Sequence, residues 1–290
     1  MGTVSMLLLY PDISSRTSAA DWRTIMDITK FYAIPGEGPL DDIKYHGGFF
    51  SIFRTVACVG DSLSSGEMES LDEAGNRGYH DYFDYSWGQF MARAAGNTVY
   101  NFSRGGMTAR EYINSFAESK GFWNPELAAQ AYIFALGVND VLNQGQPLGT
   151  IDDVDLDTTE GDIPATFAGY YGRVLAKYRA IEPKARLFLM TMPQGDTDDP
   201  RKTAHADLLH QIAAKYPYVY VIDLNRHAPR HDAEFRRNFY MGGHLNAAGY
   251  QITAWQTMTY IDWLIRNNPE DFTQIAFVGK GGVHHVGHKW

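Results

Sequence analysis

The chain of 290 residues is 44% hydrophobic and 20% charged, a composition typical of a globular protein with a full hydrophobic core. Its single cysteine, Cys58, excludes a disulfide framework and a zinc or iron–sulfur site built on cysteines. The formal net charge of −9 excludes a strongly basic nucleic-acid-binding protein, and no apolar run reaches the roughly 18 residues that a membrane-spanning helix needs.

The first 53 residues lack a regular alternation of strand-like and helix-like segments. Residues 6–10 are apolar, but this run is too short for the core of a signal peptide, and no Lys or Arg precedes it. We therefore expect a cytoplasmic protein. A Pro- and Gly-rich turn region follows at residues 34–39. We interpret residues 1–53 as an N-terminal extension packed on the core, and residues 54–290 as a single domain.

From residue 54 onward, short apolar runs alternate with segments of helical periodicity. The runs are continuously apolar, which is typical of parallel strands that are covered on both faces. The predicted strands are residues 54–60, 97–101, 131–136, 186–191 and 218–223.

Helical segments separate most of these strands and follow the last. Apolar side chains recur at helical spacing within residues 167–181, 208–216 and 252–265. Five strands that alternate with helices predict an α/β fold, namely a three-layer doubly wound (flavodoxin-like) sandwich with a five-stranded parallel sheet. Such sheets place their functional sites at the carboxyl ends of the strands.

Two segments contain metal-ligand side chains. The connection at residues 141–163 carries Asp at 153, 155 and 157, as in the first half of a calcium loop. The Gly and Glu that complete such a loop are replaced by Thr158 and Pro164. The tail contains His284, His285 and His288 beside small residues. We predict no metal site in either segment.

A serine follows the first predicted strand in the sequence Gly60-Asp61-Ser62-Leu63. At this position the chain turns from a strand into a helix, so the Ser62 hydroxyl is exposed and nearby backbone N–H groups can point at an incoming oxygen. Ser and Asp are also common helix caps, so this motif alone fits a plain structural role as well.

Three further motifs follow strands or precede the last helix. Paired glycines at 105 and 106 follow the second strand and permit a positive φ or the close approach of a ligand. Asn139 follows the third strand, where its amide can donate a hydrogen bond. His244 lies just before the last helix. Singly, the glycine and asparagine motifs also fit a loop and an Asx turn or cap.

Together, the four motifs resemble the SGNH family of hydrolases, also called the GDSL esterases and lipases, over about residues 54–266. The resemblance implies that Ser62 is the nucleophile and that His244 is its general base. It implies an oxyanion hole formed by the backbone N–H groups of Ser62 and Gly106 and the side-chain amide of Asn139. It also implies that no metal or organic cofactor is needed.

The sequence departs from the family pattern at Met241. Members usually carry an aspartate three residues before the histidine, and a thioether cannot orient an imidazole or stabilise its charge. Three explanations remain open: a Ser–His dyad oriented by a backbone carbonyl, an acid from elsewhere in the chain, or a lost activity. The candidate acids are Glu67, Asp232 and Glu234.

The resemblance implies an esterase, and we expect it to remove short acyl groups, acetyl above all, from a carbohydrate. Aromatic residues follow the serine motif at Tyr79, Tyr82, Phe83, Tyr85 and Trp87, and they fit either core packing or a surface for sugar rings. The alternatives are a lysophospholipase or acyl-thioesterase of the same family, and a non-catalytic carbohydrate-binding relative. The expected partner is a small-molecule or carbohydrate ester. The oligomeric state stays open.

Overall fold

The computed structural model describes residues 28–279 and divides the chain into two units after Glu37. The described part of the first unit contains one short 3-10 helix, η1 (Ile28–Phe31). All other elements belong to the second unit, Gly38–Trp290. In the described part of the chain, no helix combines the length and the apolar character needed to cross a membrane.

Residues 38–53 of the predicted extension lie in the same unit as the predicted domain. Their 3-10 helix η2 (Gly48–Ile52) packs against the long C-terminal helix α10 (Ala247–Asn267), and Phe50 is fully buried in the core. The backbone N–H of Phe49 donates to Asp262 of α10. The division therefore falls after Glu37, well before the expected boundary at residue 53.

A parallel five-stranded sheet forms the centre of the second unit, in the order β4-β1-β5-β6-β7. The strands are β1 (Thr55–Gly60), β4 (Thr98–Ser103), β5 (Ala131–Ala135), β6 (Arg186–Met190) and β7 (Val219–Ile222). Each coincides closely with a predicted apolar run. Most side chains of β1, β5, β6 and β7 are buried, as expected for strands covered on both faces.

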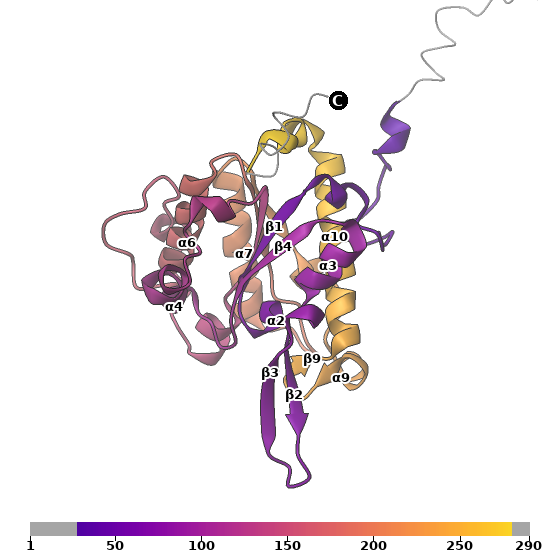
Figure 1. Cartoon of the computed structure of the whole chain (residues 1–290), viewed down its shortest axis with the longest axis vertical. Helices are drawn as coiled ribbons and strands as arrows, with labels where there is room; N and C mark the ends of the chain where they lie inside the picture. Colours follow the sequence, from indigo (N-terminus) through magenta and orange to yellow (C-terminus); the bar gives the residue numbers. More distant parts are fainter. Residues whose placement is uncertain (1–27, 280–290) are drawn as a thin grey trace, which may run out of the picture. The chain divides into compact units, whose positions relative to one another are not determined.

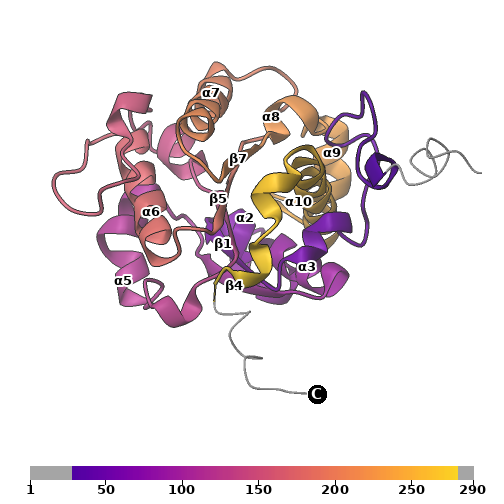
Figure 2. The ribbon, with the colours of Figure 1, turned by 90° about the horizontal axis from the view of Figure 1, so that it is seen from above.

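Helices cover both faces of this sheet. Helix α3 (Trp87–Ala95) lies beside α10 on one face, and α6 (Phe167–Ile181) and α7 (Pro200–Lys215) lie on the other (Figure 2). Both α6 and α10 begin at side-chain caps, because Thr166 and Asn246 accept backbone N–H groups of the first turn. The predicted three-layer doubly wound fold is confirmed.

Shorter helical segments connect these elements. They are α2 (Ser62–Ser65), η3 (Phe83–Tyr85), α4 (Ala109–Glu111), the π-helix η4 (Tyr112–Phe116), α5 (Ala117–Ser119), η5 (Pro125–Leu127), the π-helix η6 (Val138–Asn143), η7 (Ile151–Asp153), α8 (Leu224–His227), α9 (Ala233–Phe239), η8 (Pro269–Phe272) and η9 (Ile275–Phe277).

An antiparallel hairpin that the sequence analysis did not predict follows α2. It consists of β2 (Glu67–Leu71) and β3 (Arg77–Asp81), and it projects from the body of the unit (Figure 1). Its turn is held by Asp72, whose carboxylate accepts the N–H groups of Ala74 and Asn76. A smaller pair, β8 (Tyr240–Met241) and β9 (His244–Leu245), lies next to β2.

The acidic connection at residues 141–163 is anchored by local hydrogen bonds. The Asp153 carboxylate accepts the backbone N–H of Thr150 and the hydroxyl of Thr166, and Asp155 accepts the N–H of Asp157. These are capping and turn roles rather than metal ligation. Among the residues that the structure describes, no group of three His, Cys, Asp or Glu side chains could hold a metal ion. The tail histidines lie outside the described residues.

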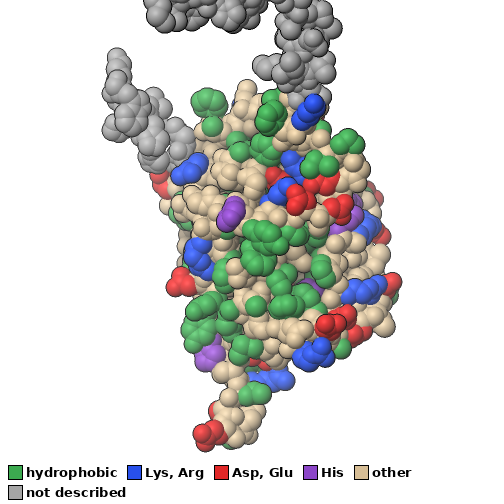
Figure 3. All heavy atoms as spheres, turned by 90° about the vertical axis from the view of Figure 1, so that its right-hand side faces the viewer, with side chains coloured by type: hydrophobic (Ala, Val, Ile, Leu, Met, Phe, Trp, Pro, Cys, Tyr) green, Lys and Arg blue, Asp and Glu red, His purple; other side chains and the backbone are tan. Residues whose placement is uncertain are grey.

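The aromatic residues after the serine motif differ in burial, and Phe83 is half-buried. Trp87 is buried in the core, whereas Tyr79, Tyr82 and Tyr85 are exposed on and beside the hairpin. Hydrophobic side chains also gather on the side of the molecule where α3 and α10 lie (Figure 3). The hydrophobic core therefore contains only some of the aromatic side chains that follow the serine motif.

Candidate active site

Ser62 is the first residue of α2, directly beyond the carboxyl end of β1. Asp61 caps this helix, because its side chain accepts the backbone N–H of Leu63 at 3.1 Å. The turn is tight: a Cβ atom on Gly60 would lie 2.2 Å from the Ser64 hydroxyl. The glycine and the aspartate together place the serine at the end of a central strand.

Gly106 and Asn139 follow the two strands that flank β1. Gly106 has a φ of +72°, a conformation that favours glycine. The Asn139 amide is oriented from both ends, since its Nδ2 donates to the Met107 carbonyl at 3.1 Å and its Oδ1 accepts from Asn143 at 2.8 Å. Together with Ser62, these residues line a hollow of about 420 Å³ at the carboxyl edge of the sheet.

His244 lines the same hollow from β9. Its Nδ1 lies 2.7 Å from Oε1 of Glu69 on β2. This carboxylate also accepts the N–H of Gly243 and pairs with the guanidinium of Arg77, each at 2.7 Å. The contact between Nδ1 and Glu69 is the one that the orienting acid of a serine triad makes.

Electrostatics favour the ionised form of Glu69. The side chain is only 6% exposed, and burial opposes ionisation. The hydrogen bonds from His244 and Gly243 and the charges of His244 and Arg77 outweigh this effect, so the pKa of Glu69 is lowered. A carboxylate held in this way keeps the imidazole in the tautomer with a proton on Nδ1.

None of the three acids named from the sequence bonds to Nδ1. Glu67 lies on the other side of the ring, with Oε1 at 3.3 Å from Nε2. Asp232 instead caps α9 by accepting the N–H of Phe235, and Glu234 belongs to the first turn of that helix. The partner is therefore a residue that the sequence analysis missed.

Met241 lies opposite His244 in the β8–β9 pair and is 43% exposed. Met241 is three residues before His244, where members of the family usually carry an aspartate. Here the carboxylate comes instead from Glu69, on the β2–β3 hairpin. A sequence signal for that hairpin exists, because residues 72–76 contain Asp, Gly and Asn between two five-residue segments. Alternation along such a strand places Glu67 and Glu69 on one face.

The paired glycines have different roles. A Cβ atom on Gly105 would lie 2.0 Å from Oε2 of Glu67, so the missing side chain leaves room for this carboxylate. Gly106 has open space around it instead, and glycine is favoured there because the backbone has a positive φ.

Burial raises the pKa of Glu67, while the charge of His244 opposes this rise.

Two buried carboxyl groups lie behind the serine. Burial raises the pKa of Asp61 to about 7, with a further contribution from the charge of Asp140. Burial also raises the pKa of Asp140 to about 6, although its carboxylate accepts the N–H of Ala109 at 2.9 Å. At neutral pH this part of the site thus has less negative charge than its composition implies.

The α/β fold, with a serine and a histidine lining one hollow at the carboxyl edge of the sheet, is that of a class of carboxylic ester hydrolases. The chain belongs to the GDSL-like lipase/acylhydrolase family, whose model matches residues 58–252. No curated protein sequence matches the chain significantly.

Solved structures share the fold at low sequence identity. A family two carbohydrate esterase from Clostridium thermocellum in complex with cellohexaose is 13% identical, with a TM-score of 0.51 over 75% of this chain and 65% of that chain. An active-site mutant of a family two carbohydrate esterase from the same organism is 14% identical, with a TM-score of 0.52 over 75% and 64%.

Proposed function

We propose that this protein removes short acyl groups, acetyl above all, from a carbohydrate ester, using Ser62, His244 and Glu69. The observation that carries the proposal is the 2.7 Å contact between His244 Nδ1 and the Glu69 carboxylate. It supplies the acid that is missing at position 241, and so removes the main reason to regard the site as a non-catalytic binding pocket.

In the proposed reaction, the Ser62 hydroxyl attacks the ester carbonyl while His244 Nε2 takes its proton. The histidine returns this proton to the leaving alcohol, and water then releases the acid by the same steps. The negative charge of Glu69 stabilises the imidazolium that forms in each half-reaction.

The geometry of the free enzyme requires one rearrangement. Among the described residues, no hydrogen bond joins Ser62 to His244, because Nε2 faces Glu67 at 3.3 Å. Catalytic hydrogen bonds often form only when substrate is bound. We expect an entering ester to displace the Glu67 carboxylate from Nε2 and so free this atom to accept the serine proton.

The proposed oxyanion hole consists of the backbone N–H groups of Ser62 and Gly106 and the amide of Asn139. The amide is held by Asn143, and fixed donors of this kind act without reorganisation during the reaction. Its Nδ2 now donates to the Met107 carbonyl at 3.1 Å and to Oδ2 of Asp61 at 3.5 Å, and we expect the oxyanion to replace the longer of these two contacts.

The charge around the hollow favours a neutral substrate. Glu67 lines it and Glu69 lies behind His244, whereas the basic partner Arg77 bonds to Glu69. A lysophospholipid carries a phosphate, and an acyl thioester of a nucleotide carrier carries several, so a phosphate placed near these carboxylates meets repulsion. The exposed Tyr79, whose ring contacts His244, offers a sugar ring an aromatic surface. These features support a carbohydrate ester over the alternatives.

Hydrolysis of p-nitrophenyl acetate, butyrate and octanoate by the wild type and by Ser62→Ala tests the proposal. We expect cleavage of acetate that depends on Ser62, with little cleavage of octanoate. Equal rates for the wild type and Ser62→Ala would contradict the catalytic proposal. A preference for octanoate would favour the long-chain alternative.

A further inference from the structure

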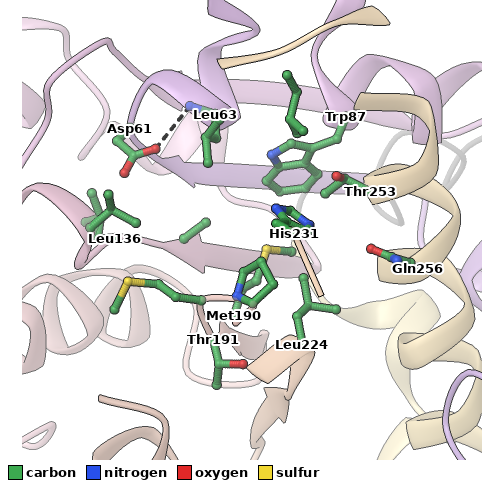
Figure 4. Close-up of a pocket in the computed structure, with 15 residues that line it drawn as sticks. Asp61, Leu63, Trp87, Leu136, Met190, Thr191, Leu224, His231, Thr253 and Gln256 are labelled. Atoms are coloured by element: carbon green, nitrogen blue, oxygen red, sulfur yellow. Dashed lines mark hydrogen bonds between the residues drawn. The ribbon is translucent and has the colours of Figure 1, made fainter. Parts of the chain in front are cut away.

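A second cavity lies directly behind the nucleophile, separate from the hollow that His244 lines. Its walls come from the carboxyl ends of β5 and β6, from the start of α8, and from α10 (Figure 4). They are mostly apolar, and they include the side chains of Leu63, Trp87, Met190, Leu224 and Leu245. The reaction proposed above has no role for this cavity.

The cavity and the catalytic hollow meet at the serine turn. Asp61, Leu63 and Val138 line both spaces, and Ser62 lies between the first two of these residues in the chain. The two spaces therefore adjoin at Leu63 and Val138, and an acyl group on Ser62 that enters the cavity must pass between these side chains. The alcohol side of the ester remains in the wider outer hollow.

The size of the cavity limits what can enter. Its volume is about 70 Å³. An engineered protein cavity of about 150 Å³ binds benzene, so a cavity about half as large holds about three or four non-hydrogen atoms. An acyl chain of up to about four carbons fits this space, and an octanoyl chain does not.

Two polar side chains face this apolar space from its far wall. Gln256 of α10 is only 5% exposed and points into the cavity (Figure 4), and among the described residues its amide has no hydrogen-bond partner. His231 bonds to the Tyr240 hydroxyl through Nδ1 and stacks on Phe235, and Nε2 has no partner among the described residues. Both groups are accessible from the cavity rather than completely enclosed, and polar atoms that open onto one end of an apolar space favour a ligand with a polar atom at that end.

The two groups offer complementary hydrogen bonding. Burial lowers the pKa of His231 to about 4, so its ring is neutral near pH 7. Since the Nδ1 proton can be donated to Tyr240, Nε2 is then able to accept a hydrogen bond. The Gln256 amide both donates and accepts. A hydroxyl group can pair with either side chain, whereas a methyl group at the same position pairs with neither.

We propose that this cavity is an acyl-chain site selective for short acyl groups that carry a hydroxyl, of the hydroxybutyryl kind, with Gln256 as the residue that reads this hydroxyl. The inference rests on the proposed function, because the acyl group must first be attached to Ser62. It deepens that function by specifying the acyl side of the substrate. Acetyl esters remain substrates although they leave the far wall unoccupied, so this inference extends the acyl range beyond the acetyl group named above.

The test compares methyl butyrate with methyl 3-hydroxybutyrate, following acid release by titration at constant pH. The wild type is expected to show at least a tenfold higher kcat/KM for the hydroxylated ester, because a site built for a hydroxyl discriminates strongly against the analogue that lacks it. Gln256→Leu is expected to bring the ratio near one, mainly by faster cleavage of butyrate. Gln251→Leu, on the same helix but lining a different surface hollow, is the matched control and keeps the wild-type ratio.

The outcomes separate the two proposals. If the wild type cleaves both esters equally and Ser62→Ala cleaves neither, the acyl-site proposal is wrong and the proposed function stands. If Ser62→Ala keeps the wild-type rate, the proposed function itself is wrong. An unchanged preference in a folded Gln256→Leu variant also overturns the role of this residue. If the Gln256→Leu variant does not fold, the ratio of the wild-type kcat/KM values for the two esters still tests whether the site prefers the hydroxylated acyl group.

Discussion

The Nδ1 atom of His244 lies 2.7 Å from a carboxylate oxygen of Glu69, although 175 positions separate these residues in the chain. The hairpin β2–β3 carries Glu69 to this place, and Arg77 on its other strand pairs with the same carboxylate. The acid of the site thus comes from an element directly after the nucleophile rather than from the segment before the histidine.

Replacing Glu69 by Gln tests this arrangement. An amide in place of the carboxylate removes the charge that stabilises the imidazolium and no longer enforces the correct tautomer, and the equivalent change in the standard triad lowers turnover about 10⁴-fold. We expect a loss of roughly 10²- to 10⁴-fold in kcat, measured on p-nitrophenyl acetate. Glu73→Gln, in the turn of the same hairpin, is the matched control. A loss under threefold in Glu69→Gln would favour a dyad.

Replacing Asn139 by Ala tests the oxyanion hole. Loss of one such donor typically raises the barrier by about 2.7–4 kcal/mol, which lowers kcat about 10²- to 10³-fold. We expect KM to change little, because the donor acts on charge that develops in the transition state. Asn143→Ala, which removes the contact that orients the amide, should give a smaller loss in the same assay. A change confined to KM would contradict this role.

The paired glycines allow a double-mutant cycle. Gly105→Ala places a methyl group against the Glu67 carboxylate and forces this carboxylate to move. We therefore expect kcat/KM to change, in a direction set by the new position of the carboxylate. In a Glu67→Ala background the clash is gone, and the same substitution should have an effect under twofold. A coupling energy of about 0.5–3 kcal/mol from kcat/KM would be normal for residues in contact. Additive effects would show that the two residues act independently.

Gly106→Ala has a different consequence, since the position has a positive φ and open space around it. The cost is backbone strain, roughly 1–2 kcal/mol, rather than a clash. Denaturant unfolding should therefore reveal a loss of stability of this size. An unchanged free energy of unfolding would mean that the turn relaxes to another conformation.

The raised pKa of Asp61 predicts that the free energy of unfolding depends on pH. Its pKa is raised to about 7 in the folded protein, mainly by burial, so the folded state holds a proton that the unfolded state releases near pH 4. Stability is therefore highest below about pH 4 as far as this group is concerned, and falls as the pH rises towards 7. Asp61→Asn, which keeps the helix cap, removes this fall.

The measurement is the difference in free energy of unfolding between Asp61→Asn and the wild type at pH 5 and at pH 8. We expect the variant to gain more at pH 8 than at pH 5, by roughly 2–3 kcal/mol, because the unfolded state already releases its proton below pH 5 and part of the full effect is lost there. A difference that does not depend on pH would show that Asp61 titrates in the normal range. Since the assay measures unfolding, it does not depend on the activity of the variant.

The sequence determined the five strands, the main helices and the residues at the strand ends. Continuous apolar runs and helical stripes are local patterns, because each depends on the covering of one element. Ser62, Gly106 and Asn139 could be named because their motifs follow predicted parallel strands, whose carboxyl ends meet at one edge, and because these motifs resemble those of the SGNH family. His244 could be named because it precedes the last helix, whose cap and apolar face are readable in the chain.

Only the tertiary structure decided which acid meets His244, where the first unit ends, and that a cavity lies behind the serine. Each depends on how distant segments are placed: β2 contacts β9, η2 contacts α10, and α10 faces the ends of β5 and β6 across the cavity. The direction of a side chain across such contacts is set by packing and by hydrogen bonds that no local pattern encodes. Glu67 and Glu69 lie on the same strand with the same chemistry, and only the pairing of that strand puts Glu69 at Nδ1 and Glu67 at Nε2.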